Sequence, residues 1–175
     1  MFRRFLPRDI ASLPRWAPFL AIILLGLLAH AFVFQADFHM DDELHITGSA
    51  YVLEGRWFDA KFQWIPVFIW TFVAQSIGFS GPVLHALNFA VHLAIACTLF
   101  PVATRLFALT EFFKDERSSK LAALLGALLF VCHPLTTEPV HYTRCLMIDF
   151  VTLFSLLTAL FTLRFVARPN LRDVI

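Results

Sequence analysis

The sequence has little charge and few cysteines. Charged residues make up only 15% of the 175 residues, whereas hydrophobic residues make up 59%. A soluble domain carries about a quarter charged and about half apolar residues, so this composition argues against that class. The net charge of +1 gives no indication of a nucleic-acid partner. The three cysteines form no CxxC pair and lie in or beside apolar runs, which predicts packing residues rather than disulfides or a zinc site.

Hydrophobic residues are instead concentrated in long runs, which predict membrane spans. The clearest runs cover residues about 16–34, 82–109, 121–135 and 146–166. The basic flank before the first run is also typical of a signal peptide, but the run is long enough to span, and we favour a retained helix. A further apolar stretch, residues 64–79, is shorter and is interrupted by Gln75 and Gly78. We predict a helix at the membrane interface there, with a fifth crossing as the alternative.

The distribution of basic residues predicts the orientation of the four spans. Cytoplasmic segments of membrane proteins carry an excess of Lys and Arg. One set of segments holds Arg3, Arg4, Arg8, Arg15, Arg105, Lys114, Arg117, Lys120, Arg164, Arg168 and Arg172, and the other holds only Arg56, Lys61 and Arg144. We therefore predict a single all-α integral membrane domain over residues 1–175 with both termini cytoplasmic. Its long first outer loop, residues 35–81, is expected to carry interfacial helices.

Three consecutive acids, Asp41, Asp42 and Glu43, follow the first run closely. Carboxylates at this spacing could coordinate a divalent cation, or one of them could act as a general base. The alternative is structural, because Asp41 or Asp42 could cap a helix over residues 44–53 that ends at Gly55. The two interpretations are compatible, since a cap also fixes a carboxylate in place.

Three polar residues share one face of the second span, because His85, Asn88 and His92 are spaced at i, i+3 and i+7. Polar groups at membrane depth usually face protein, water or a cofactor. We favour interhelical hydrogen bonds, and the alternative is a haem or pigment ligand. No second span offers a clearly matched partner histidine.

The third group of candidates lies between the third and fourth spans. Pro134 is expected to end a helix, which leaves His133 and Glu138 on the same outer side as the acidic cluster. This segment is either an ordinary proline turn or a second wall of an outer-face site. Asp149 lies just inside the fourth span, where a carboxylate needs a partner, and Arg144 is the nearest candidate by sequence.

Three segments in this order resemble a known family. The acidic pair followed by AYVLEGRWF, the stretch GPVLHALNFAVHL and the stretch HPLTTEPVHY resemble GT-C glycosyltransferases of the transmembrane, tetratricopeptide-repeat O-mannosyltransferase branch. The resemblance implies that Asp42, or its rival Asp41, with Glu43 beside it, takes a proton from the acceptor while a lipid phosphate leaves. It also implies that His133, Glu138 and Arg144 bind donor or acceptor, with no dedicated cofactor.

Three functions are consistent with the sequence. The first is sugar transfer from a polyprenyl-phosphate donor on the outer face, by this chain or by an enzyme of which it is part. The second is a non-catalytic scaffold subunit of a larger membrane complex, which the small number of spans favours. The third is a haem- or pigment-binding subunit that uses His85 and His92. Membrane lipids and other membrane proteins are the expected partners, and a bacterial inner membrane with periplasmic acidic loops is the expected location.

Overall fold

The structure is a computed structural model that describes residues 14–38, 42–136 and 138–167. This part of the chain is helical and contains no strand, as the predicted all-α class requires. The α-helices are α1 (Ala17–Ala29), α2 (Ala50–Leu53), α3 (Trp64–Ile77), α4 (Gly81–Leu109), α5 (Glu116–Cys132), α6 (Glu138–His141) and α7 (Leu146–Ala167). Shorter helical turns connect them, namely η3 (Val33–Gln35), η4 (Glu43–Thr47), η5 (Trp57–Gln63), η6 (Pro134–Thr136) and η7 (Thr143–Cys145).

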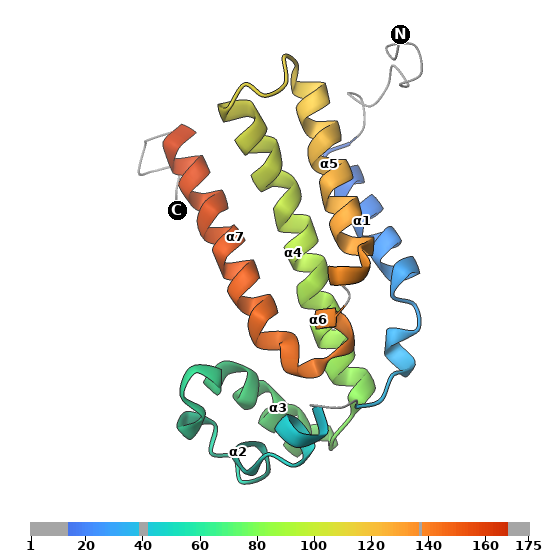
Figure 1. The fold of residues 1–175 in the computed structure, drawn as a ribbon, viewed down its shortest axis with the longest axis vertical. Coiled ribbons are helices and arrows are strands. Elements are labelled where there is room, and N and C mark those ends of the chain that lie inside the picture. The colour runs from blue at the N-terminus through green and yellow to red at the C-terminus, as the bar shows by residue number, and fades with distance from the viewer. Residues whose placement is uncertain (1–13, 39–41, 137, 168–175) are drawn as a thin grey trace.

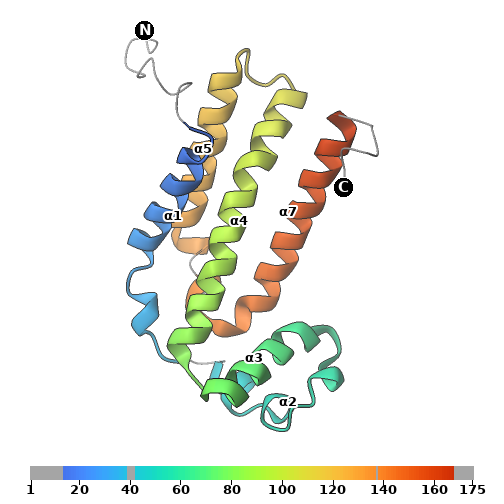
Figure 2. The same ribbon diagram turned by 180° about the vertical axis from the view of Figure 1, so that it is seen from behind.

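Four helices, α1, α4, α5 and α7, run side by side as a bundle (Figure 1). Helix α4 lies between α7 and α5, and α1 packs against both α4 and α5 (Figure 2). Helices α4 and α7 run in the direction opposite to α1 and α5, so α1 begins at the end where α7 finishes. The short elements from η4 to α3 cover the other end of the bundle.

The two ends of the bundle differ in charge. The end that carries the α4–α5 turn is called the basic end, and it holds Arg15, Arg105, Lys114, Arg117, Lys120 and Arg164 together with Glu111, Asp115 and Glu116. The opposite end is called the acidic end, and it holds Asp37, Asp42, Glu43, Glu54, Asp59, Glu138 and Asp149 together with Arg56, Lys61 and Arg144. Charge is therefore segregated along the bundle axis.

Within the described part of the chain, two segments are long and apolar enough to cross a membrane, Gly81–Leu109 and Thr143–Val166. A third arises if Glu116–Cys132 and Pro134–His141, which meet at 64°, count as one broken span. Helix α1 has 13 residues. At about 1.5 Å per residue it covers about 20 Å, less than the ~30 Å hydrocarbon layer. The first apolar run is thus not one continuous helix to Phe34 as expected, because α1 ends at Ala29 and a turn leads to η3. Long apolar helices of this kind are typical of membrane proteins.

The helix expected over residues 44–53 is broken in two. The N–H of Gly48 donates to the carbonyl of Glu43 at 2.7 Å, which closes the wide turn η4, and Ser49 is extended before α2 begins. Glycine lacks a side chain and loses more entropy in a helix than any other residue, so the break falls at Gly48. Gly55, with φ +68°, follows the end of α2, as predicted.

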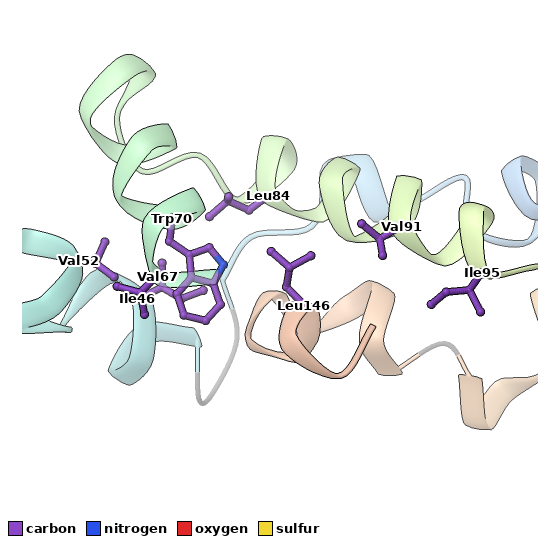
Figure 3. Close-up of a cluster of buried hydrophobic side chains, with 8 residues drawn as sticks. All are labelled: Ile46, Val52, Val67, Trp70, Leu84, Val91, Ile95 and Leu146. Atoms are coloured by element: carbon purple, nitrogen blue, oxygen red, sulfur yellow. The ribbon is translucent and has the colours of Figure 1, made fainter. Parts of the chain in front are cut away.

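Two hydrophobic clusters hold these elements together. One joins Ile46, Val52, Val67 and Trp70 from the first loop to Leu84 of α4 and Leu146 of α7 (Figure 3). The other joins α1, α4 and α5 through Ile22, Ala96, Ala127 and Val131. The first cluster fixes the short helices of the loop against the starts of α4 and α7, which is where the candidate site lies.

Candidate functional site

Asp42 connects the first loop to the start of α7. Its carboxylate is fully buried and accepts hydrogen bonds from the backbone N–H groups of Thr143, at 3.1 Å, and Arg144, at 2.8 Å. It makes no capping bond within its own turn η4. The predicted capping role is therefore corrected for Asp42, which satisfies donors at the beginning of η7, just before α7 and about a hundred residues away in the chain, while the same prediction for Asp41 lies outside the described residues. Such donors and the helix dipole stabilise a negative charge.

The same segment is held from the other side by α4. The amide Nδ2 of Asn88 donates to the carbonyls of Pro139, at 2.7 Å, and Tyr142, at 2.9 Å. The two ring nitrogens of His85 face the carbonyls of Val140 and Asp37, each at 3.2 Å. The hydrogen-bonding role predicted for this face of α4 is confirmed for both residues, although their partners are backbone carbonyls of the short helix α6 and of connecting segments rather than of another long helix.

A pocket of about 420 Å³ opens beside the beginning of α7 at the acidic end. Its walls are formed by Gln63, Trp70, Glu138, Tyr142, Arg144, Cys145, Met147 and Ile148. The pocket thus combines one carboxylate, one guanidinium, a phenol and an amide with two apolar side chains. The indole N–H of Trp70 is buried without a hydrogen-bond partner among the described residues, so an acceptor supplied by a ligand would relieve a cost of roughly 1–3 kcal/mol.

The structure brings together only some of the predicted site residues. Glu138 and Arg144 line the pocket, and Asp42 lies directly behind its wall through the bond to the backbone of Arg144. Glu43 and His133 are exposed and do not line it. The Nδ1 atom of His133 instead accepts from the N–H of Leu135 at 3.2 Å, within its own turn. Asp41 lies outside the described residues, so its role as an alternative catalytic carboxylate stays a prediction.

Charged side chains gather where α6, η7 and α7 follow one another. Cys145, at the end of η7, lines the pocket together with Glu138 and Arg144. Asp149 is buried in the first turn of α7, and its Oδ2 atom has no hydrogen-bond partner in the described part of the chain. Its predicted pairing with Arg144 stays a prediction. With Asp42 bound to the backbone of η7, three carboxylates and one guanidinium therefore lie near the start of α7.

His92 differs from the other two polar residues on its face of α4. Its ring stacks on Phe130, with centroids 5.0 Å apart, and lies 5.5 Å from the ring of His30. His30 follows α1 directly and binds the carbonyl of Val131 through Nε2 at 3.0 Å. The sequence interpretation did not anticipate that these two histidine rings lie side by side. Among the described residues no group of three or more potential metal ligands comes together.

Several pocket residues were not anticipated. Gln63, Trp70, Met147 and Ile148 line the site, but in the sequence they are part of apolar runs or short connections that show no functional pattern. Tyr142 also lines it; it ends the stretch HPLTTEPVHY but was not predicted as a site residue. Only the tertiary packing of α3 against the start of α7 reveals them. No known protein family, no curated protein and no solved structure matches the chain.

Proposed function

We propose that the chain is a GT-C-like integral membrane module that transfers a sugar from a polyprenyl-phosphate donor at the acidic end, alone or as part of a larger enzyme. The observation that carries the proposal is the position of Asp42. A buried carboxylate is fixed by two backbone N–H groups directly behind a pocket that also contains a carboxylate and a guanidinium. Catalytic groups need such rigid placement.

The pocket residues supply the chemistry that this transfer requires. The oxygen of an acceptor hydroxyl forms a bond to the anomeric carbon, and the bond between that carbon and the phosphate oxygen breaks. The acceptor proton passes to a carboxylate, for which Asp42 and Glu138 are the candidates. Arg144 offers the planar guanidinium that binds phosphate in two-point fashion. Trp70 and Gln63 provide a ring and an amide for the sugar, and Met147 and Ile148 provide an apolar wall for the lipid.

The proposal includes a membrane orientation. Four helices cross or enter the membrane, the basic end is cytoplasmic, and the acidic end faces the periplasm of a bacterial inner membrane. The segregation of charge supports this orientation, since Lys and Arg favour the cytoplasmic side. In this arrangement α3 lies at the outer interface.

A non-catalytic scaffold is the second candidate, and a specific observation favours it. Asp42 is 0% exposed, and both of its carboxylate oxygens serve the backbone of the next segment. Helix α7 also presents a series of exposed apolar side chains along its length: Ile148, Val151, Phe154, Phe161 and Phe165. In a scaffold, Asp42 would serve only to hold the first loop against the start of α7, and α7 would contact another membrane protein.

Sugar transfer is tested with the full chain in vesicles that contain radiolabelled polyprenyl-phosphate hexoses and a membrane extract as the source of acceptor. Wild-type protein should move label out of the donor lipid. Asp42→Asn, assayed at a temperature at which its helix content is intact, should abolish transfer, and Glu138→Gln should reduce it strongly. Asp37→Asn is the matched control, because Asp37 is an exposed carboxylate at the same end. Full transfer by both folded pocket variants would remove the enzyme proposal, and co-purification with a partner at fixed stoichiometry would then support the scaffold.

A further inference from the structure

A second pocket, of about 660 Å³, lies at the basic end, far from the candidate site. It is formed between α1, α4 and α5, and its lining includes the small side chains Ala17 and Ala21 of α1. These two residues are one turn apart and therefore share one face of the helix. Leu121 and Leu124 of α5 form the facing wall. The hollow thus exists because small side chains occupy the positions where larger ones would fill the gap between the helices.

The mouth of this pocket is positively charged. Arg15, Arg117 and Lys120 line it together with a single acid, Glu116. Glu116 forms an ion pair with Lys120, at 2.6 Å, that is exposed to solvent. Such an exposed pair contributes little and leaves both groups open to other partners. The lining therefore has an excess of positive charge over an apolar interior.

Three features of this end indicate the chemistry of the occupant. The walls are mainly alkyl side chains from helices whose apolar faces are typical of membrane contact. The charges lie at the helix ends, which in the membrane orientation proposed above is the level where lipid headgroups meet water. Trp16, 61% exposed, lies next to the lining residue Arg15 in the sequence, and tryptophan is enriched at that level. Basic pockets between membrane helices on the cytoplasmic side bind the headgroups of acidic lipids.

We infer that this pocket binds an anionic glycerophospholipid of the surrounding leaflet, with the headgroup phosphate at Arg15 and Lys120 and an acyl chain along Ala21 and Leu124. This inference rests on the membrane orientation proposed above, but not on sugar transfer, because the pocket lies at the opposite end from the candidate site. Its effect is to fix the first helix of the bundle against α5 when such a lipid is present.

The experiment uses native mass spectrometry of the full chain, purified and supplied with equal amounts of phosphatidylglycerol and phosphatidylcholine. Wild-type protein should retain one phosphatidylglycerol in preference to phosphatidylcholine. Removing one basic contact near a membrane surface weakens anionic lipid binding about fivefold, so Arg15→Gln with Lys120→Gln should weaken retention on the order of twentyfold. The matched control is Lys114→Gln with Arg164→Gln, which removes the same charge from the same end outside the pocket. Its effect should stay below about threefold, because neither side chain lines the pocket and salt screens the field of exposed charges.

A second pair of variants tests the apolar part without changing charge. Leu124→Trp fills the pocket and should abolish retention, whereas Leu125→Trp, at a neighbouring side chain that is 52% exposed and outside the pocket, should leave it intact. Equal retention of phosphatidylcholine would overturn the inference. Equal losses in the control variants, or displacement of the lipid by millimolar inorganic phosphate, would overturn it as well.

Discussion

The two hydrogen bonds that the Asp42 carboxylate accepts allow a quantitative prediction of the free energy of unfolding. Asp42→Asn replaces one carboxylate oxygen by NH₂, and because the N–H groups of Thr143 and Arg144 bind different oxygens, one of them loses its acceptor. The new amide NH₂ then faces the remaining N–H, donor against donor. We expect the loss of one charge-assisted hydrogen bond, about 1.5–3 kcal/mol, and of the favourable charge at a helix start, about 0.3–1 kcal/mol. The free energy of unfolding should therefore fall by about 2–4 kcal/mol.

The measurement is reversible unfolding in mixed micelles with an increasing fraction of sodium dodecyl sulfate, followed by circular dichroism. Asp37→Asn again serves as the control, because, among the described residues, its exposed carboxylate accepts a hydrogen bond from the N–H of Phe38 alone, at 2.9 Å. Surface changes of this kind stay within about 0.5 kcal/mol. If Asp42→Asn also stayed within 0.5 kcal/mol of wild type, the carboxylate would not be the joint between the first loop and α7, and the account of the site would be wrong.

Two further predictions use the same unfolding assay. Asn88→Leu removes both hydrogen bonds to the carbonyls of Pro139 and Tyr142. These carbonyls would be left without a donor, which should lower the free energy of unfolding by about 1–3 kcal/mol. An unfolding transition at the wild-type midpoint would contradict this role of Asn88. Gly26→Ala places a Cβ 2.6 Å from Cδ2 of Leu93 and should cost about 1–3 kcal/mol by overpacking. Gly126→Ala, where a Cβ meets no atom within 4 Å, should instead stabilise α5 by roughly 0.5–1 kcal/mol, and a loss equal to that of Gly26→Ala would refute the packing argument.

Much of the helical pattern could be predicted because apolar runs and their interruptions are local signals. The predicted run at 82–109 corresponds to Gly81–Leu109, and the run at 146–166 corresponds to Leu146–Ala167. The first run was predicted too long, since hydrophobicity continues to Phe34 although the helix ends at Ala29. Composition shows which residues avoid water, but it does not show where His30 leaves the helix to bind the carbonyl of Val131.

The candidate site was predictable in its residue types and less so in its geometry. Glu138 and Arg144 were identified by charge at a chain reversal, and both line the pocket. The hydrogen-bond partners of Asp42 could not be identified, because a carboxylate two residues before a helical pattern gives no information about donors a hundred residues later. Trp70 could not be predicted as a pocket residue for a similar reason: the sequence does not distinguish an aromatic residue that faces lipid from one that lines a ligand pocket.

The three polar side chains at the acidic end have one physical task in common. Asp42, His85 and Asn88 all bind backbone groups of residues 139–144, where the chain leaves regular helix between α5 and α7. Non-helical backbone near a membrane must find its hydrogen bonds inside the protein, because lipid offers none. Any chain that breaks a span at this place needs such partners, whether or not it is an enzyme.

The scaffold and the enzyme proposals therefore predict the same geometry at Asp42. They differ in what they predict for Glu138, whose exposed carboxylate makes none of the three sets of backbone hydrogen bonds just described. Glu138→Gln should leave the fold unchanged in both cases, and only an enzyme should lose turnover.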